Sequence, residues 1–356
     1  MSTSSPAALV FDWGDTLMTT FPESSGAMVD WPKVAAEPGA VDALAQLIRR
    51  YRLLVGTNAA NSSAAQVQAA LDRAGLGGYI ERVFTVHELH SRKPEPGFYR
   101  ALQQLTGLPT HQIVMVGDDF NVDISGAWQA GWRSVWYNPG AVAAPALFPL
   151  QDAEVTHLSA LPAVLAAPSL PGVQQCTAWL IHQRASTGLL AHVQAVAALA
   201  YQMAVWLRAS GQSVDPLLAH RGGLLHDLVK LAPPPPGPAA DHGARAAVLL
   251  LEHQQPALAE IANRHLLHLI LDANRAPRTW EEKLVYLADK LVEGSRPVTL
   301  EERLASLRRR YPANTGEIEA SAPAIHHLQT ELCAHLGLAP QELTPRLTNA
   351  VRGNSS

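Results

Sequence analysis

Two groups of residues in this chain have types and spacings that could support chemistry, one group in each half. In the first half, polar side chains follow short apolar segments: Asp12, Thr57, Asn58, Lys93, Asp118 and Asp123. In the second half the candidates are histidines and aspartates within or at the start of predicted helices, three of these sites with apolar neighbours: His192, His226, Asp227, His242, His265 and Asp289. Carboxylates beside a hydroxyl and an ammonium suit Mg²⁺ and a phosphoryl group, whereas imidazoles with carboxylates suit divalent ions such as Fe, Mn or Zn.

The first group must be positioned by alternating strands and helices. Strands are predicted over 7–13, 52–57, 113–118, 133–137 and 155–158, and helices over 41–50, 62–74, 97–105, 124–130 and 160–167. Wholly apolar strands that alternate with helices predict an α/β fold, a doubly wound parallel sheet covered on both faces. Because ligands bind at the carboxyl ends of such strands, we expect the first group of residues to converge there.

The second half is expected to be all-α. Residues 173–186, 189–210, 216–231, 243–252, 257–271 and 279–293 fit the 3.6-residue period of a helix. The prolines 233–236 predict a loop between helices. We therefore expect a first domain over 1–167, a linker over 168–175, a helical domain over 176–330 and a C-terminal extension over 331–356, with the polar residues from about 341 loosely held.

Composition narrows the functional classes. The 356 residues are 47% hydrophobic and 16% charged, with a formal net charge of -4, which argues against disorder, nucleic-acid binding and a polybasic membrane anchor. Two cysteines exclude a disulfide framework and a Cys-rich zinc module. Residues 189–207 come nearest to a membrane span, but His192, Gln194 and Gln202 interrupt them and predict a buried helix of a cytoplasmic protein. The oligomeric state stays open.

Four segments of the first half occur in a recognisable order: 11–17 (FDWGDTL), 56–58 (GTN), 93–94 (KP) and 117–123 (GDDFNVD). Over residues 7–167 the chain thereby resembles the haloacid dehalogenase-like (HAD) hydrolase superfamily. The resemblance implies that Asp12 is a nucleophile that forms an aspartyl-phosphate and binds Mg²⁺. It also implies that Thr57 and Asn58 bind the substrate, that Lys93 stabilises charge, and that Asp118 and Asp123 position the metal.

One position departs from the pattern of that superfamily. Its phosphatases carry a general acid/base Asp two residues after the nucleophile, where this chain has Gly14, and Asp15 comes one residue later. In an extended chain a shift of one residue turns the side chain to the other face. Residues 18–38 are also too few for a separate cap domain. Two interpretations stay open, a phosphatase and a metal- and phosphate-binding module with a regulatory role, beside the simpler one of helix-capping residues.

The second half resembles the HD-domain phosphohydrolase superfamily over about residues 176–310. The resemblance rests on His192 together with the segments 223–230 (GLLHDLVK), 242–244 (HGA), 264–265 (RH) and 282–290 (EKLVYLADK), followed by Arg296. One branch is most similar, the bacterial symmetrical bis(5'-nucleosyl)-tetraphosphatases. This implies His192, His226, Asp227 and Asp289 as metal ligands, His242 and His265 on a second metal, with Fe or Mn as candidate ions, and Lys230 and Arg296 on substrate phosphates.

The resemblance predicts a hydrolase for nucleotide phosphoanhydrides or phosphoesters, with diadenosine tetraphosphate as the type substrate. A small phosphorylated molecule, rather than nucleic acid or a membrane, is the expected partner. The Pro-rich stretch after Leu231 and residues 266–269 (LLHL) differ from related enzymes and affect the substrate more than the metal. Lys230 could instead be a solvated helix-end charge, and we expect four other histidines, His182, His220, His253 and His268, to be core residues. A nucleotide sensor without turnover is the competing function, and a scaffold is less favoured.

Overall fold

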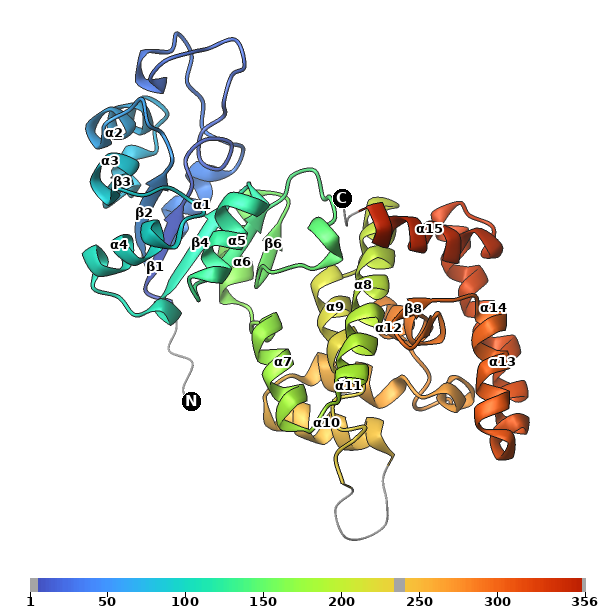
Figure 1. Cartoon of the computed structure of the whole chain (residues 1–356). Helices are drawn as coiled ribbons and strands as arrows, with labels where there is room; N and C mark the ends of the chain where they lie inside the picture. Colours follow the sequence, from blue (N-terminus) through green and yellow to red (C-terminus); the bar gives the residue numbers. More distant parts are fainter. Residues whose placement is uncertain (1–5, 234–240, 354–356) are drawn as a thin grey trace. The chain divides into compact units, whose positions relative to one another are not determined.

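The computed structural model describes residues 6–233 and 241–353, which divide into two compact units (Figure 1). The first unit consists of Met1–Val142 and Leu150–Ser169, and the second of Ala143–Pro149 and Leu170–Ser356. The short segment 143–149 therefore belongs to the helical unit, although it lies within the first half of the sequence. The last change of unit, at Ser169, falls within the expected linker.

The first unit is built on a six-stranded parallel sheet in the order β3-β2-β1-β4-β5-β6. Its strands are β1 (Ala8–Phe11), β2 (Arg52–Thr57), β3 (Arg82–Thr85), β4 (Ile113–Gly117), β5 (Arg133–Tyr137) and β6 (Ala153–Val155). This is the doubly wound architecture that the strand–helix alternation predicts. The edge strand β3 was not predicted from the sequence, and the last strand ends at Val155, where the predicted strand 155–158 begins.

Helices cover both faces of this sheet, because alternate residues of each strand point to opposite sides. On one face Leu9 and Phe11 of β1 pack in a core with α1 (Ala40–Leu47), α2 (Ala64–Arg73) and α6 (Leu161–Ala166). On the other face Ala8 and Val10 pack with α4 (Pro96–Thr106) and α5 (Ser125–Gln129). With both faces covered, the carboxyl ends of the strands remain for the polar residues. The four-residue helix α3 (Val86–Leu89) follows β3.

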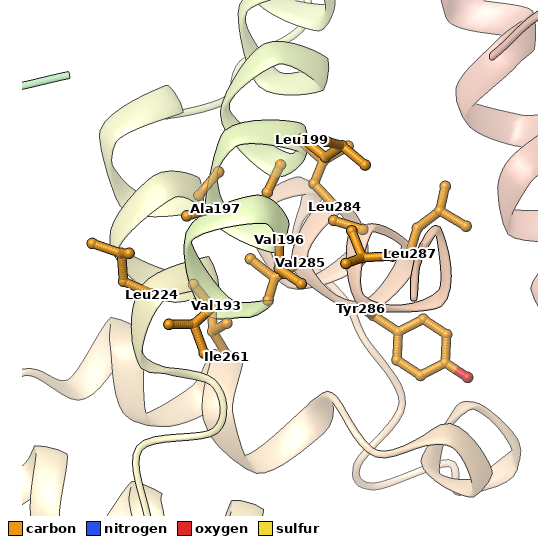
Figure 2. Packing of buried hydrophobic residues seen from close by; sticks show 14 of the residues in the cluster. Val193, Val196, Ala197, Leu199, Leu224, Ile261, Leu284, Val285, Tyr286 and Leu287 are labelled. Carbon is orange, nitrogen blue, oxygen red and sulfur yellow. The ribbon is translucent and has the colours of Figure 1, made fainter. Parts of the chain in front are cut away.

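The second unit is helical apart from a two-stranded hairpin of β7 (Val292–Glu293) and β8 (Arg296–Pro297). Its helices are α7 (Val173–His182), α8 (Thr187–Ala209), α9 (Pro216–Leu225), α10 (His242–Glu252), α11 (Pro256–Arg264), α12 (Trp280–Lys290), α13 (Leu300–Arg310), α14 (Thr315–Leu336) and α15 (Pro340–Gly353). Figure 2 shows residues of α8, α9, α11 and α12 that pack together in one apolar core.

Helix α8 is the centre of this core. Within the described residues it alone is long and apolar enough, by length and composition, to cross a membrane, and 61% of the most apolar window is buried. Gly223 lets α9 approach it closely, since a Cβ at this position would lie 2.5 Å from the Cα of Ala197. The burial agrees with the prediction of a core helix over 189–210.

Three expectations for the helical half were wrong. The helix predicted over 216–231 ends at Leu225, because the chain continues in a turn whose backbone bonds join Leu228 to Leu225 and Lys230 to Asp227. The helix predicted over 257–271 breaks after Arg264 into a separate 3₁₀ turn, Leu267–Leu271. Residues from 341 are not loosely held, since α15 buries Leu343 and Leu347 in the core.

Two further boundaries need comment. Residue 331, where a C-terminal extension was expected to begin, lies inside the continuous helix α14. Of the proline loop, Pro233 is described, whereas Pro234, Pro235 and Pro236 lie outside the described residues.

Candidate metal centres and active sites

The strand ends of the first unit bring Asp12, Lys93 and Asp123 into direct contact. The Nζ of Lys93 donates to Asp12 Oδ1 and, over 2.6 Å, to Asp123 Oδ1. Lys93 and Asp123 are almost fully buried. Burial would lower the pKa of Lys93, but the two carboxylates outweigh it and raise the pKa. The lysine therefore stays charged and ties two of the predicted residues together.

A third carboxylate completes this group. Oxygens of Asp12, Asp118 and Asp123 all lie within 4.8 Å of one another. Thr16 Oγ1 donates to Asp118 Oδ1 over 2.7 Å. Burial raises the pKa of Asp118 to about 6 and that of Asp123 to about 7, the latter against the opposing charge of Lys93. Three crowded carboxylates beside one ammonium fit a hard divalent cation with oxygen ligands, such as Mg²⁺.

Thr57 is the last residue of β2, and Asn58 follows it; their side chains make different contacts. Thr57 borders a cavity of about 270 Å³ that Asp12 also lines. The side chain of Asn58 donates to the carbonyl of Lys93 over 2.9 Å and accepts from the amide of Lys93 over 2.8 Å. Asn58 therefore holds the backbone of Lys93, a positioning role that the sequence pattern did not indicate.

Asp15 is held by hydrogen bonds from Thr20. It is exposed, its φ of 54° lies in the left-handed region, and its Oδ1 accepts from the backbone N and the Oγ1 of Thr20 over 2.9 and 2.7 Å. Met28 and Trp31, from the segment 18–38, line the cavity over Asp12 instead of a separate cap domain. The backbone at Asp15 is not extended, unlike the geometry assumed for the one-residue shift.

In the second unit, Asp227 lies at the centre of the predicted histidines. Its Oδ1 is 3.0 Å from His242 Nε2 and 3.3 Å from His265 Nε2, while its Oδ2 is 3.4 Å from His226 Nε2. His192 Nε2 lies 3.1 Å from Asp289 Oδ1. All six predicted ligands thus meet in one cluster, with the two oxygens of Asp227 directed to different histidines.

Backbone carbonyls orient three of the imidazole rings. The Nδ1 atoms of His192, His226 and His265 lie 3.0, 2.7 and 2.7 Å from the carbonyl oxygens of Gly294, Gly223 and Ala262. A ring that donates from Nδ1 to a carbonyl presents the Nε2 lone pair to its other side, as ligating histidines do. The Nε2 atoms all face Asp227 or Asp289.

Two buried atoms of the cluster are unsatisfied by the described residues. Neither His226 Nε2 nor Asp227 Oδ1 has an aligned hydrogen-bond partner there, although nitrogens lie close by. Burial lowers the pKa of His265 to about 4 and so favours its neutral form. Burial would raise the pKa of Asp227, but the surrounding histidines hold it well below its ordinary range. An ionised, unsatisfied carboxylate surrounded by imidazole nitrogens fits bound divalent metals.

Cations surround this cluster, and sequence reasoning found only one of them. Lys230 Nζ donates to Asp227 Oδ2 over 2.6 Å. Lys290, which is buried, donates to Asp289 Oδ2 over 2.7 Å, and Arg303 of α13 lies 3.9 Å from Asp289. A lysine directly after a ligand in an apolar helix was a signal for Lys290, whereas nothing local marked Arg303. Arg296, the other proposed substrate-binding cation, is exposed on β8.

Of the four histidines expected in the core, only one is fully buried. His220 is buried, and its Nδ1 lies 2.7 Å from the guanidinium of Arg221. His182 and His253 are exposed rather than in the core, because they lie at the ends of α7 and α10, and His268 is half-buried.

Comparison with known proteins assigns a class to each unit. A family model described as HAD-hydrolase-like matches residues 90–159, and the HD-domain model matches residues 189–294. The chain therefore contains a HAD-like domain and an HD domain. These ranges include Lys93, Asp118 and Asp123 in the first domain and all six clustered ligands in the second.

Among individual proteins, the chain is 38% identical over 104 residues to pyrimidine 5'-nucleotidase PynA of Streptococcus pneumoniae, which is 28% of this chain and 42% of that protein. It is 34% identical over 68 residues to a phospholysine phosphohistidine inorganic pyrophosphate phosphatase of Rattus norvegicus, 18% of this chain and 25% of that protein. An uncharacterized protein of Methanocaldococcus jannaschii is 30% identical over 145 residues, 38% of this chain and 83% of its own length. The chain thus spans less than half of the two characterised relatives.

Among the solved structures that are similar to this chain is that of a 2-haloacid dehalogenase from Pseudomonas syringae. It is 34% identical, covers 38% of this chain and 54% of its own, and has a TM-score of 0.33.

Proposed function

We propose that the protein is a metal-dependent phosphohydrolase whose principal site is the histidine–aspartate cluster of the HD domain. The observation that carries this proposal is the position of Asp227, with one oxygen beside His226 and the other beside His242 and His265. A carboxylate placed in this way is suited to bridge two divalent ions, such as Fe or Mn. His192 and Asp289 would complete one ion's ligands, and His242 and His265 would hold the other.

Two bound ions would polarise a phosphoryl oxygen and lower the pKa of water. The residues of the chain supply the remainder. Lys230, with its side chain 43% exposed, can turn from Asp227 toward a phosphate oxygen, and Arg303 adds a second cation on the side of Asp289. Carbonyl contacts to the imidazole Nδ1 atoms fix the ring orientations before any ligand arrives.

For the substrate we propose a nucleotide phosphoanhydride or phosphoester, including diadenosine tetraphosphate cleaved to ADP. Support comes from the HD-domain match and from the pyrimidine 5'-nucleotidase and the phospholysine phosphohistidine inorganic pyrophosphate phosphatase among the relatives. The setting we propose is the cytoplasm.

The HAD domain is proposed as a second, Mg²⁺-dependent phosphatase that uses Asp12. Asp12 borders the cavity, and Lys93 contacts the carboxyl group that would attack phosphorus. Asp118 and Asp123 would hold the ion. A regulatory phosphate-binding role remains the second candidate, because Gly14 leaves this cavity without the usual acid.

The test compares full-length wild type with Asp12→Asn and Asp227→Asn on a panel of nucleotides, with released phosphate and products separated by chromatography. We expect Asp227→Asn to abolish the transition-metal-dependent cleavage and to lower bound transition metal, while Asp12→Asn removes only Mg²⁺-dependent phosphate release. Unchanged rates in both variants would refute both assignments. Tight binding of an intact nucleotide without product would favour the regulatory role.

A further inference from the structure

The cavity over Asp12 contains no described group that could protonate a leaving group. It is lined by Asp12, Trp13, Gly14, Thr20, Gly26, Met28, Trp31, Thr57, Asn58, Ala59 and Asn61. Among these only Asp12 is ionisable, and Asp12 is the proposed nucleophile. General acid catalysis requires a group within hydrogen-bond reach of the departing atom, so the lining is the place where an acid would have to appear.

Neighbouring groups do not fill this role. Asp15 is exposed, and both the amide and the hydroxyl of Thr20 donate to it. The Thr20 proton is thus directed at Asp15, and its oxygen can only accept from the cavity. Lys93 is nearly fully buried, and its ammonium donates to Asp12 and Asp123. Loss of a proton from Lys93 would leave two carboxylates without their counter-charge.

Building on the proposed role of Asp12, we propose that the HAD site acts on phosphoanhydrides and acyl phosphates, whose leaving groups depart without a proton, rather than on alkyl phosphate monoesters. Asp12 attacks phosphorus, the bond from phosphorus to the leaving oxygen breaks, and that oxygen takes the electron pair as an anion. Water then attacks the phosphorus of the aspartyl-phosphate. The bond to Asp12 breaks, which returns the carboxylate and releases phosphate and a proton to solvent.

A weakly basic leaving group makes the first step independent of an acid, whereas an alkoxide is too basic to leave in this way. The second step also lacks a base within the described lining. The aspartyl-phosphate should therefore accumulate during turnover, as it would not if both steps were assisted.

Gly14 allows the missing acid to be restored. Its backbone lies outside the left-handed region, and a Cβ would meet the Thr20 Cγ2 methyl at 3.1 Å, which a small movement of that side chain relieves. Gly14→Asp therefore adds a carboxyl group to the cavity lining. Gly14→Ala adds the same Cβ without the carboxyl group and is the matched control.

The experiment measures the Asp12-dependent rate, wild type minus Asp12→Asn, on acetyl phosphate, p-nitrophenyl phosphate, phenyl phosphate and ethyl phosphate with Mg²⁺. We expect kcat/KM to fall at least about 100-fold from p-nitrophenyl to ethyl phosphate. Gly14→Asp should raise the ethyl phosphate value about 100-fold, and Gly14→Ala should not raise it. Hydroxylamine should release phosphate from wild-type protein quenched during turnover.

A kcat/KM that is independent of the leaving group would overturn the inference and leave the phosphatase function standing, with an acid supplied from elsewhere. If Asp12→Asn removes none of the rate, the phosphatase function itself fails, and the inference fails with it. Should Gly14→Asp not fold, the leaving-group series on wild type and the hydroxylamine assay decide alone.

Discussion

The Nε2 atoms of His242 and His265 lie 3.1 Å apart, although His242 begins α10 and His265 follows the end of α11. His265 points its Nδ1 at the carbonyl of Ala262, so its Nε2 presents a lone pair to His242. One proton or one cation must therefore occupy the space between these nitrogens. The next group beyond them is Asp227 Oδ1, which favours a cation over a proton because the oxygen is itself unsatisfied.

The first prediction concerns metal stoichiometry. Purified protein should hold about two transition-metal equivalents in the HD domain, and His265→Gln should lose about one of them. Metal content measured by mass spectrometry tests this, with His327→Gln, an exposed histidine of α14, as the control. Equal metal content in wild type and His265→Gln would remove His265 from the ligand set.

Removal of metal should also destabilise the protein. Because the ions are expected to bind only the folded state, free metal at 100 times its dissociation constant adds about 2.7 kcal/mol to the free energy of unfolding. A chelator should therefore lower the thermal midpoint, and added metal should restore it. The exposed-site variant Asp42→Asn should behave like wild type, whereas Asp227→Asn should show no response to metal.

Lys290 should contribute more to the free energy of unfolding than Lys283, a half-buried lysine on the same helix. The ammonium of Lys290 is buried and donates to Asp289 and to the carbonyl of His265. Lys290→Met removes the ammonium that donates directly to the buried carboxylate of Asp289, so we expect the metal-free protein to lose about 3–5 kcal/mol in chemical denaturation. Lys283→Met removes a partly exposed pair with Glu331 and should cost about 1 kcal/mol or less. Similar losses in both variants would contradict the burial argument.

His220 should make stability depend on pH. Burial, followed by the charge of Arg221, holds the pKa of His220 well below its ordinary value, so the folded state keeps this ring neutral. The unfolded chain takes up a proton below about pH 6.5, and stability is therefore lost as the pH falls through that value. Between pH 7.5 and 5.5 the loss attributable to His220 is about 1.4 kcal/mol.

Denaturation of His220→Asn at both pH values measures this loss, because the Asn oxygen can still accept from Arg221 but does not titrate. Wild type should lose about 1.4 kcal/mol more than the variant. His111→Asn, at an exposed position, should follow wild type at both pH values. An identical pH response of wild type and His220→Asn would show that this ring does protonate when folded.

The last helix offers a test of the corrected C-terminus. Leu343 of α15 is fully buried, so Leu343→Ala should lower the free energy of unfolding by about 2–5 kcal/mol. Leu271→Ala, at a residue 54% exposed in the same unit, should cost about 0.5 kcal/mol or less. A negligible effect at Leu343 would mean that α15 contributes little to the core.

Apolar periodicity was enough to predict the parallel sheet and the core helices, because burial on both faces leaves a strong pattern. The sequence pattern did not predict strand β3, because this edge strand has only four residues and begins with a charged one, Arg82. The end of α9 at Leu225 was also hidden, as Leu228 and Val229 continue the apolar pattern into a turn.

The candidate ligands were found because imidazoles and carboxylates in apolar surroundings are unusual. The orientation of each ring was not predictable, since it depends on the carbonyls of residues such as Gly294, 102 positions from His192. Arg303 was missed for a related reason. Its guanidinium is held by Glu293, and its proximity to Asp289 arises from packing of α13 and not from local spacing.

Residues 143–149 belong to the helical unit, although they are encoded within the first half of the sequence. The chain passes from the first unit to the second, back again, and then to the second once more. The backbone amide of Ala144 donates to the hydroxyl oxygen of Tyr201, and Arg221 donates to the carbonyl of Pro149, so the helical unit includes a segment encoded far upstream. A gene that began at residue 170 would encode a helical unit lacking one of its own parts. Recombination at the linker would therefore separate residues 143–149 from the helical unit to which they belong. The two halves of the gene are expected to be inherited together for this reason.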